Sequence, residues 1–122
     1  MANLEQELKD RTKRLAVDVI RLVECLPRRL SPEIIGKQLI RCATSIGANY
    51  RAACRARSKA DFIAKLAIAE EESDETLYWL EVLQELKLAE EQSLNRLHGE
   101  AEEITKILTA SGKTAKQSMT KS

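Results

Sequence analysis

The chain has 122 residues, of which 43% are hydrophobic, 32% charged and only 3% aromatic. This length supports one domain. With four glycines and two prolines, the chain lacks the frequent turn residues of a β-sandwich or barrel, and its composition favours long helices. The formal net charge is +1, which excludes an overtly basic nucleic-acid-binding protein.

The sequence predicts a cytoplasmic protein. It contains no run of about 20 apolar residues that could span a membrane, and its acidic N-terminus lacks the basic and apolar regions of a signal peptide. The three cysteines form no C-x-x-C pair, so reduced thiols are expected and a zinc site is not. Cys42 and Cys54 lie among small apolar residues and are interpreted as buried structural thiols.

Two helices are predicted in the first half of the chain. Apolar residues spaced alternately four and three positions apart predict a helix over about 3–26, which ends before Pro27. Ser31 as N-cap and Pro32 at the first helical position predict a second helix over 32–56. Glycine within a helix costs about 1 kcal/mol relative to alanine, so Gly47 predicts the closest approach of a neighbouring helix.

Two further helices are predicted over 59–88, with Ser58 as N-cap, and over 92–110. Residues 111–122, rich in serine, glycine, lysine and threonine, are predicted to form a disordered C-terminal tail. Because the links are short, neighbouring helices should be antiparallel. The sequence therefore predicts an all-α, up-down-up-down four-helix bundle over 1–110.

Two segments carry a family resemblance: ATSIGANYR at 43–51 and ESDETLYWL at 72–80. Between them stand RS at 57–58 and DFI at 61–63. The chain resembles the four-helix-bundle (S23-type) proteins encoded in 23S rRNA intervening sequences over about 8–110. It is also similar to the accessory protein of diversity-generating retroelements, a five-subunit ring that contacts nucleic acid and a reverse transcriptase. The resemblance implies a bacterial cytoplasmic protein that assembles into a homopentameric ring, and it supplies no catalytic residues.

The charge is distributed unevenly along the chain. Residues 1–60 carry a net charge of +7 and residues 61–122 a net charge of −6. Basic residues of the second predicted helix share one stripe about 27 Å long, which could follow phosphates. The candidate nucleic-acid-binding residues are Lys37, Arg51, Arg55, Arg57 and Lys59.

The same cations have a structural interpretation. If the second and third helices fold back on each other, Arg41 comes near Glu70 and Asp74, and a partly buried ion pair is expected. Pairing within or between subunits is the expected role for part of the stripe. The two interpretations remain open for the cluster 51–59.

Three polar or aromatic residues are expected to have structural roles. Asn49 lies in an otherwise apolar stretch and could fix helix register or cap a helix across the bundle. Tyr78 and Trp79 are adjacent, so only one can face the core. The other is expected in a subunit contact.

No catalytic motif is present, and no cofactor or small-molecule substrate is predicted. A bundle di-iron site needs Glu-x-x-His on two helices, whereas the single histidine, His98, follows Asn95 at that spacing. The sequence therefore predicts a non-enzymatic, self-assembling bundle, a ring scaffold that could contact RNA, DNA or a nucleic-acid-bound partner. The alternative is a purely structural homo-oligomer or protein–protein adaptor without nucleic-acid binding.

Overall fold

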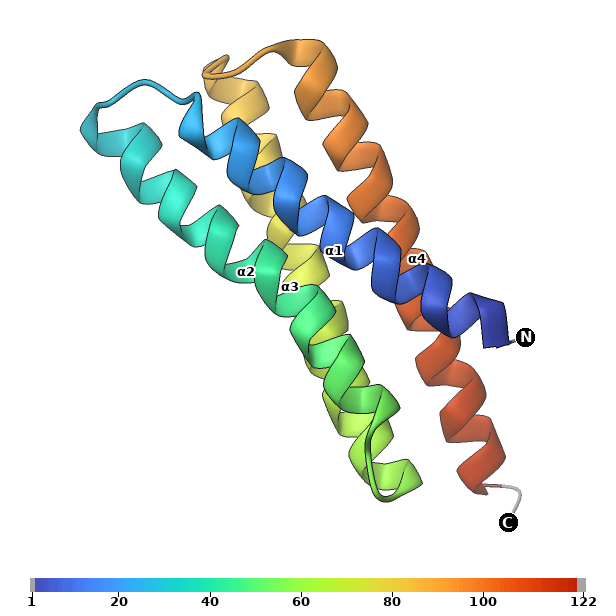
Figure 1. Ribbon diagram of the computed structural model, residues 1–122. Helices are drawn as coiled ribbons and strands as arrows, with labels where there is room; N and C mark the ends of the chain where they lie inside the picture. Colours follow the sequence, from blue (N-terminus) through green and yellow to red (C-terminus); the bar gives the residue numbers. More distant parts are fainter. Residues whose placement is uncertain (1, 121–122) are drawn as a thin grey trace.

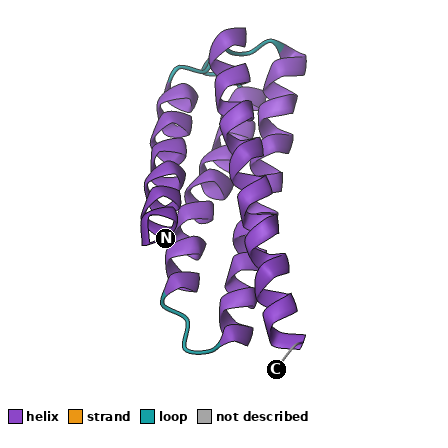
Figure 2. Ribbon diagram, turned by 90° about the vertical axis from the view of Figure 1, so that its right-hand side faces the viewer, coloured by secondary structure: helices purple, strands orange, loops and turns teal. Residues whose placement is uncertain are grey.

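The computed structural model describes residues 2–120 as four antiparallel helices in sequence order (Figure 1). These are α1 (Ala2–Glu24), α2 (Leu30–Cys54), α3 (Lys59–Leu86) and α4 (Glu91–Thr120). The α1–α2 and α3–α4 loops lie at one end of the bundle, here called the double-loop end, and the α2–α3 loop lies at the other, the single-loop end (Figure 2). The predicted up-down-up-down four-helix bundle is confirmed.

The core is built from the apolar stripes that the sequence shows. In α1 the spacing of four and three residues brings Leu8, Leu15 and Val19 into the interior, with Thr12 buried among them. In α4 the same spacing buries Leu94, Leu97, Ala101, Ile104 and Leu108. Burial of these side chains, at about 25 cal/mol per Å² of apolar surface, is the main force that holds the four helices together.

Two glycines of α2 allow α1 to pack closely against it. A Cβ atom on Gly47 would stand 2.9 Å from Thr12 Oγ1, and one on Gly36 would stand 2.7 Å from Val23 Cγ1. A neighbouring helix does come close at Gly47, but Gly47 is not the closest approach as predicted, because the helices are at least as close at Gly36, which the sequence analysis missed. Both pairs lie in the same antiparallel register, so α1 and α2 form a closely packed hairpin.

Helix α4 continues where the sequence predicted a disordered tail. It runs through Thr120, so 111–120 are helical, while 121–122 lie outside the described residues. The register explains the difference, because Thr109 on α4 pairs with Glu70 on α3. The first three turns of α3 therefore lie beyond Ala110, and the last turns of α4 cover them, with Ala115 buried and Lys59 Nζ 2.6 Å from Ser118 Oγ.

The helix ends agree with the sequence only in part. Ser58 caps α3 as predicted, since its side chain accepts a hydrogen bond from the Asp61 backbone N–H at 3.0 Å. Helix α2 instead begins at Leu30, with Arg29 as an N-cap that makes no side-chain hydrogen bond. Ser31 therefore lies inside the first turn and is not the N-cap. Helix α3 ends two residues early, because Lys87 adopts a left-handed conformation with φ 53°.

Candidate interaction surfaces

The α2–α3 pairing predicted for Arg41 exists, but its partners differ. Arg41 contacts Glu75 and, at 3.2 Å, Glu72, instead of Glu70 and Asp74. Its side chain is half exposed, so the ion pairs are surface interactions of small individual energy. The wrong partners follow from an assumed register that was off by one or two residues.

Glu70 and Asp74, the predicted partners of Arg41, do not pair with it. Glu70 accepts a hydrogen bond from Thr109 Oγ1 at 2.5 Å and so joins α3 to α4. Asp74 is exposed on the outer side of α3. Asn49 also differs from expectation, because its Nδ2 donates to the carbonyl and the hydroxyl of Ser45 within α2. It does not bridge helices.

Most of the candidate nucleic-acid-binding residues are exposed and carry no ion pair within the described chain. Arg51 and Arg55 lie in the last turn of α2 and at its C-cap, and Arg57 lies in the following loop. Lys59 donates to Ser118 Oγ on α4. Lys37 lies 14 residues before Arg51 on the same helix, roughly 21 Å away, so the structure separates it from this cluster.

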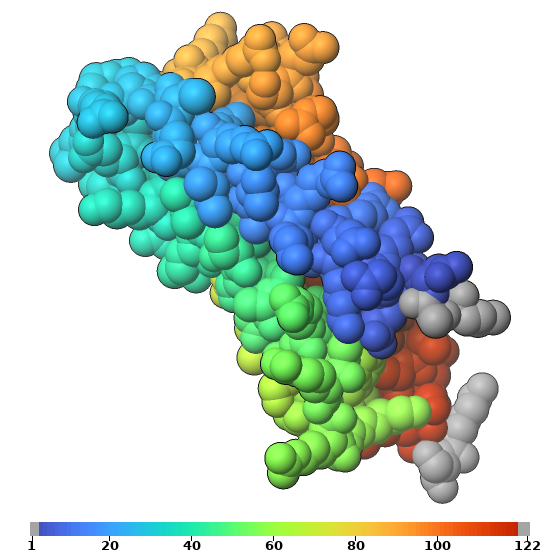
Figure 3. All heavy atoms as spheres, viewed as in Figure 1, coloured from blue at the N-terminus to red at the C-terminus, as the bar shows by residue number. Residues whose placement is uncertain are grey.

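Two further cations belong to the single-loop end of the bundle. Lys113 and Lys116 lie in the helical extension of α4, whose register with Lys59 brings this extension beside the start of α3. Figure 3 shows the single-loop end formed by α2, α3 and α4 beyond the start of α1. Sequence reasoning missed both lysines because it assigned them to a disordered tail. We call Arg51, Arg55, Arg57, Lys59, Lys113 and Lys116 the basic end.

Of the adjacent aromatic residues Tyr78 and Trp79, only one faces the core, as predicted. Trp79 packs against the core, and its Nε1 donates to Glu75 Oε2 at 3.2 Å. Tyr78 is 57% exposed, and its ring meets the Trp79 ring edge-on at a centroid distance of 5.0 Å. Whether Tyr78 makes the predicted subunit contact stays a prediction.

Other large apolar side chains are exposed toward the double-loop end. Leu30 and Ile34 on α2 are 74% and 51% exposed, and Leu86 on α3 is 53% exposed. The contact between Cys42 Sγ and Thr76 Oγ1 sets the α2–α3 register, which places Ile34 and Leu30 beside the last two turns of α3. Leu30, Ile34, Tyr78 and Leu86 therefore form an apolar surface, of the kind that marks an interaction site.

The cysteines are unequal in exposure. Cys42 is buried and Cys54 is partly buried, while Cys25 is exposed after the last turn of α1. Burial raises the pKa of the Cys42 and Cys54 thiols above their usual range. Both thiols are therefore poor nucleophiles, in keeping with the structural role expected from their apolar surroundings.

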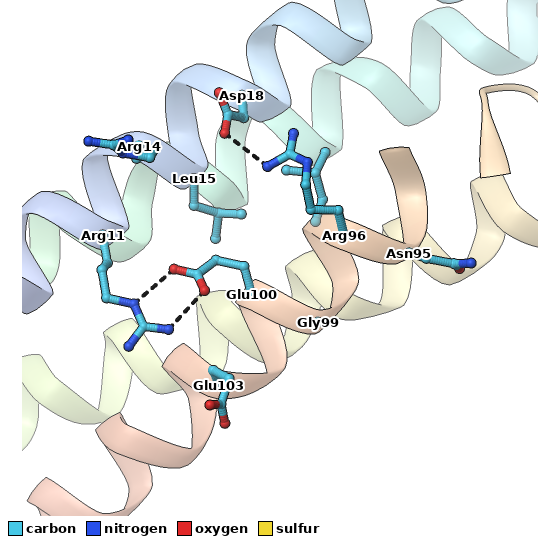
Figure 4. Close-up of a pocket in the computed structure, with 10 residues that line it drawn as sticks. Arg11, Arg14, Leu15, Asp18, Asn95, Arg96, Gly99, Glu100 and Glu103 are labelled. Atoms are coloured by element: carbon cyan, nitrogen blue, oxygen red, sulfur yellow. Dashed lines mark hydrogen bonds and ion pairs between the residues drawn. The ribbon is translucent and has the colours of Figure 1, made fainter. Parts of the chain in front are cut away.

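The α1–α4 side of the bundle is the loosest. Helix α1 packs more closely on α2 than on α4, and two cavities of about 500 Å³ each follow one another along the α1–α4 groove. Figure 4 shows two ion pairs that cross it, Arg11 with Glu100 at 2.8 Å and Arg96 with Asp18 at 3.3 Å. The hydrogen bond to Glu100, together with the negative charge of that carboxylate, raises the pKa of Arg11.

The described residues contain no candidate metal site. Across residues 2–120, no group of three or more histidines, cysteines or acids is arranged to hold a metal ion. His98 Nε2 lies 2.9 Å from Glu81 Oε2 on the neighbouring helix. None of the four described helices is long and apolar enough to cross a membrane.

These features define a four-helix-bundle protein with an exposed apolar surface and a basic end. Residues 5–110 match the protein family described as "23S rRNA-intervening sequence protein". The chain belongs to this family, as the sequence resemblance implied. No curated protein matches the chain.

A solved structure shows the same fold. It is a protein of unknown function from the S23 ribosomal protein family of Bacteroides thetaiotaomicron. It is 37% identical to this chain, with a TM-score of 0.82, and the match covers 89% of this chain and 97% of the other.

Proposed function

We propose that this chain is a non-enzymatic scaffold that acts by assembling with copies of itself into a closed ring. The carrying observation is the apolar surface of Leu30, Ile34, Tyr78 and Leu86, which the single bundle leaves exposed. A soluble protein gains free energy when such a surface is removed from water. A ring of five subunits is the assembly that the family resemblance implies, and head-to-tail contacts close into rings when the rotation permits.

The proposal predicts a defined oligomer at micromolar concentration. Light scattering coupled to a sizing column should give about five times the 13.7 kDa chain mass. The substitutions Ile34→Ser and Leu86→Ser should each lower this mass, because both remove apolar surface from the contact. Leu4→Ser, at another exposed apolar position, is the matched control. A monomeric parent would contradict the proposal.

The basic end favours a second role, contact with nucleic acid. Arg51, Arg55 and Arg57 have no acidic partner within the described chain, and the lysines of α4 extend the same positive region. Cations near phosphates release counterions, and affinity then falls with salt by a slope of roughly −0.7 per contact on a single strand. The helix C-terminal dipole also favours cations at the end of α2, so the positive charge alone does not decide the role.

Fluorescence anisotropy with labelled RNA separates the two explanations. If Arg51 and Arg55 contact phosphates, replacing both with alanine should flatten the salt slope by one to two units and leave the oligomer unchanged. Arg28→Ala with Arg29→Ala, at the opposite end of α2, is the matched control. If the arginines instead pair with acids of a neighbouring subunit, the substitution should loosen the oligomer. Absence of binding by the parent at about 50 mM salt would reject nucleic-acid contact.

A further inference from the structure

We infer that the assembly forms by insertion of one edge of α3 from one copy into the α1–α4 groove of the next copy. This inference rests on the proposed self-assembly and names the two surfaces that meet. The inserted element is an i, i+4, i+8 ridge formed by Tyr78, Val82 and Leu86, with Tyr78 and Leu86 more than half exposed. Such a ridge is the unit that packs into a groove between helices.

The groove has room for these side chains. Its first cavity, about 500 Å³, has Leu15 and Leu97 on its floor, and Gly99 opens onto it. A Cβ on Gly99 would meet no heavy atom within 4 Å, so contacts inside the bundle do not require a glycine there. The second cavity, of similar size, is lined by Leu22, Ala89 and other residues near the double-loop end.

The ridge and the cavities lie at the same height along the bundle. Glu81 contacts His98 and Gln84 contacts Asn95, which places Tyr78 level with residues 100–101 of α4, beside Gly99. The same register places Leu86 level with residue 93, in the second cavity. Rotation about an axis parallel to the helices changes no height. In a ring built about such an axis, Tyr78 of one copy would meet the first cavity of its neighbour and Leu86 would meet the second.

Charges along the two surfaces are complementary at these heights. Arg14 and Arg21 stand on the α1 side of the groove and have no acidic partner within the described chain. Figure 4 shows Arg14 outside both ion pairs that cross the groove. Glu81 and Glu85 flank the ridge, and the α1–α4 register set by Asp18 and Arg96 brings Arg21 level with Glu85. Opposite charges that meet in this way select the correct partner surface and orientation.

The two surfaces lie on different parts of the bundle. In the order of helices around the bundle, α3 lies next to α4 and diagonally across from α1. The ridge on α3 and the α1–α4 groove are therefore different surfaces of the bundle, and contact between them is head-to-tail. Head-to-tail contacts join each copy to the next and close into a ring when the rotation between copies permits.

A crosslinking experiment tests this docking directly. Tyr78→Cys and Gly99→Cys are placed together in a chain with Cys25→Ser and Cys54→Ser, and the protein is treated with a short bismaleimide. Docking of ridge into groove predicts a ladder of covalent multimers that ends at the number of subunits. Each single variant should give no ladder. Crosslinked dimers from Tyr78→Cys alone would show that two α3 edges meet each other, and would overturn the inference.

A substitution that fills the groove tests the same docking without crosslinking. Gly99→Trp fills the first cavity at a position with open space, so the monomer should keep its helical circular dichroism while the dissociation constant of the assembly rises about tenfold or more. Gly99→Ala is the control and should leave assembly intact. If the parent assembles but Gly99→Trp assembles equally and no ladder forms, the docking is wrong while self-assembly stands. A monomeric parent overturns both.

Discussion

Thr12 of α1 lies so close to Gly47 of α2 that a Cβ on the glycine would stand 2.9 Å from Thr12 Oγ1. Gly47→Leu should therefore destabilise the bundle by about 1–3 kcal/mol or more through overpacking. Thermal unfolding followed by circular dichroism measures this effect. Gly99→Ala serves as the matched contrast, because the open space there lets alanine gain up to about 1 kcal/mol of helix propensity. A melting temperature for Gly47→Leu within a degree of the parent would refute the close crossing.

Lys87 holds a left-handed backbone conformation, φ 53°, at the end of α3. The N–H of Leu88 donates to the Leu83 carbonyl at 3.2 Å, the arrangement in which glycine is usually found. Lys87→Gly should stabilise the protein by about 0.5–1 kcal/mol, seen as a higher urea midpoint with an unchanged slope. Lys87→Ala keeps the strained backbone and should show no such gain. Equal midpoints for the two variants would contradict the assignment.

The helical extension of α4 should contribute to stability. A chain that ends at Ala110 loses the buried Ala115 and the Lys59–Ser118 contact, and exposes part of Leu66. We expect a loss on the order of 1–3 kcal/mol by burial of apolar surface, measured by urea unfolding. A chain that ends at Thr120 is the control. If both shortened chains unfold like the parent, the segment does not pack as described.

Stability should fall in alkaline solution. Burial raises the pKa of the Cys42 and Cys54 thiols from the usual 9.0, and that of the Tyr50 phenol from the usual 10.0. Groups with raised folded-state pKa values stabilise the fold fully below the unfolded-state pKa, and this stability is lost as the pH rises toward the folded-state pKa. Unfolding free energies measured upward from pH 9 should therefore decline.

The variant Tyr50→Phe isolates the contribution of one residue to this loss of stability in alkaline solution. It keeps the buried ring but has no phenol to ionise, so its unfolding free energy should decline less steeply above pH 10 than that of the parent. At neutral pH it should be less stable by about 0.5–1.5 kcal/mol, because the hydrogen bond with Cys54 is lost. Parallel declines in parent and variant would show that Tyr50 does not contribute.

The sequence by itself determined the bundle and most of its core. The spacing that buries Leu8, Leu15 and Val19 on α1 is a local property, since 3.6 residues per turn place such residues on one side of a helix. Ser58 could likewise be recognised as an N-cap, because its hydrogen bond closes within three residues. The segments 43–51 and 72–80 also indicated the family from the sequence alone, because each is a continuous run of residues.

Only the tertiary structure decided which surfaces come together. The partners of Arg41 depend on the register between α2 and α3, and a shift of one or two residues replaces Glu70 and Asp74 with Glu72 and Glu75. The residues after Ala110 are polar and weakly patterned, so they become helical only because the start of α3 lies beside them. The α1–α4 groove depends on how far two helices distant in sequence stand apart, and no spacing within either helix encodes that distance.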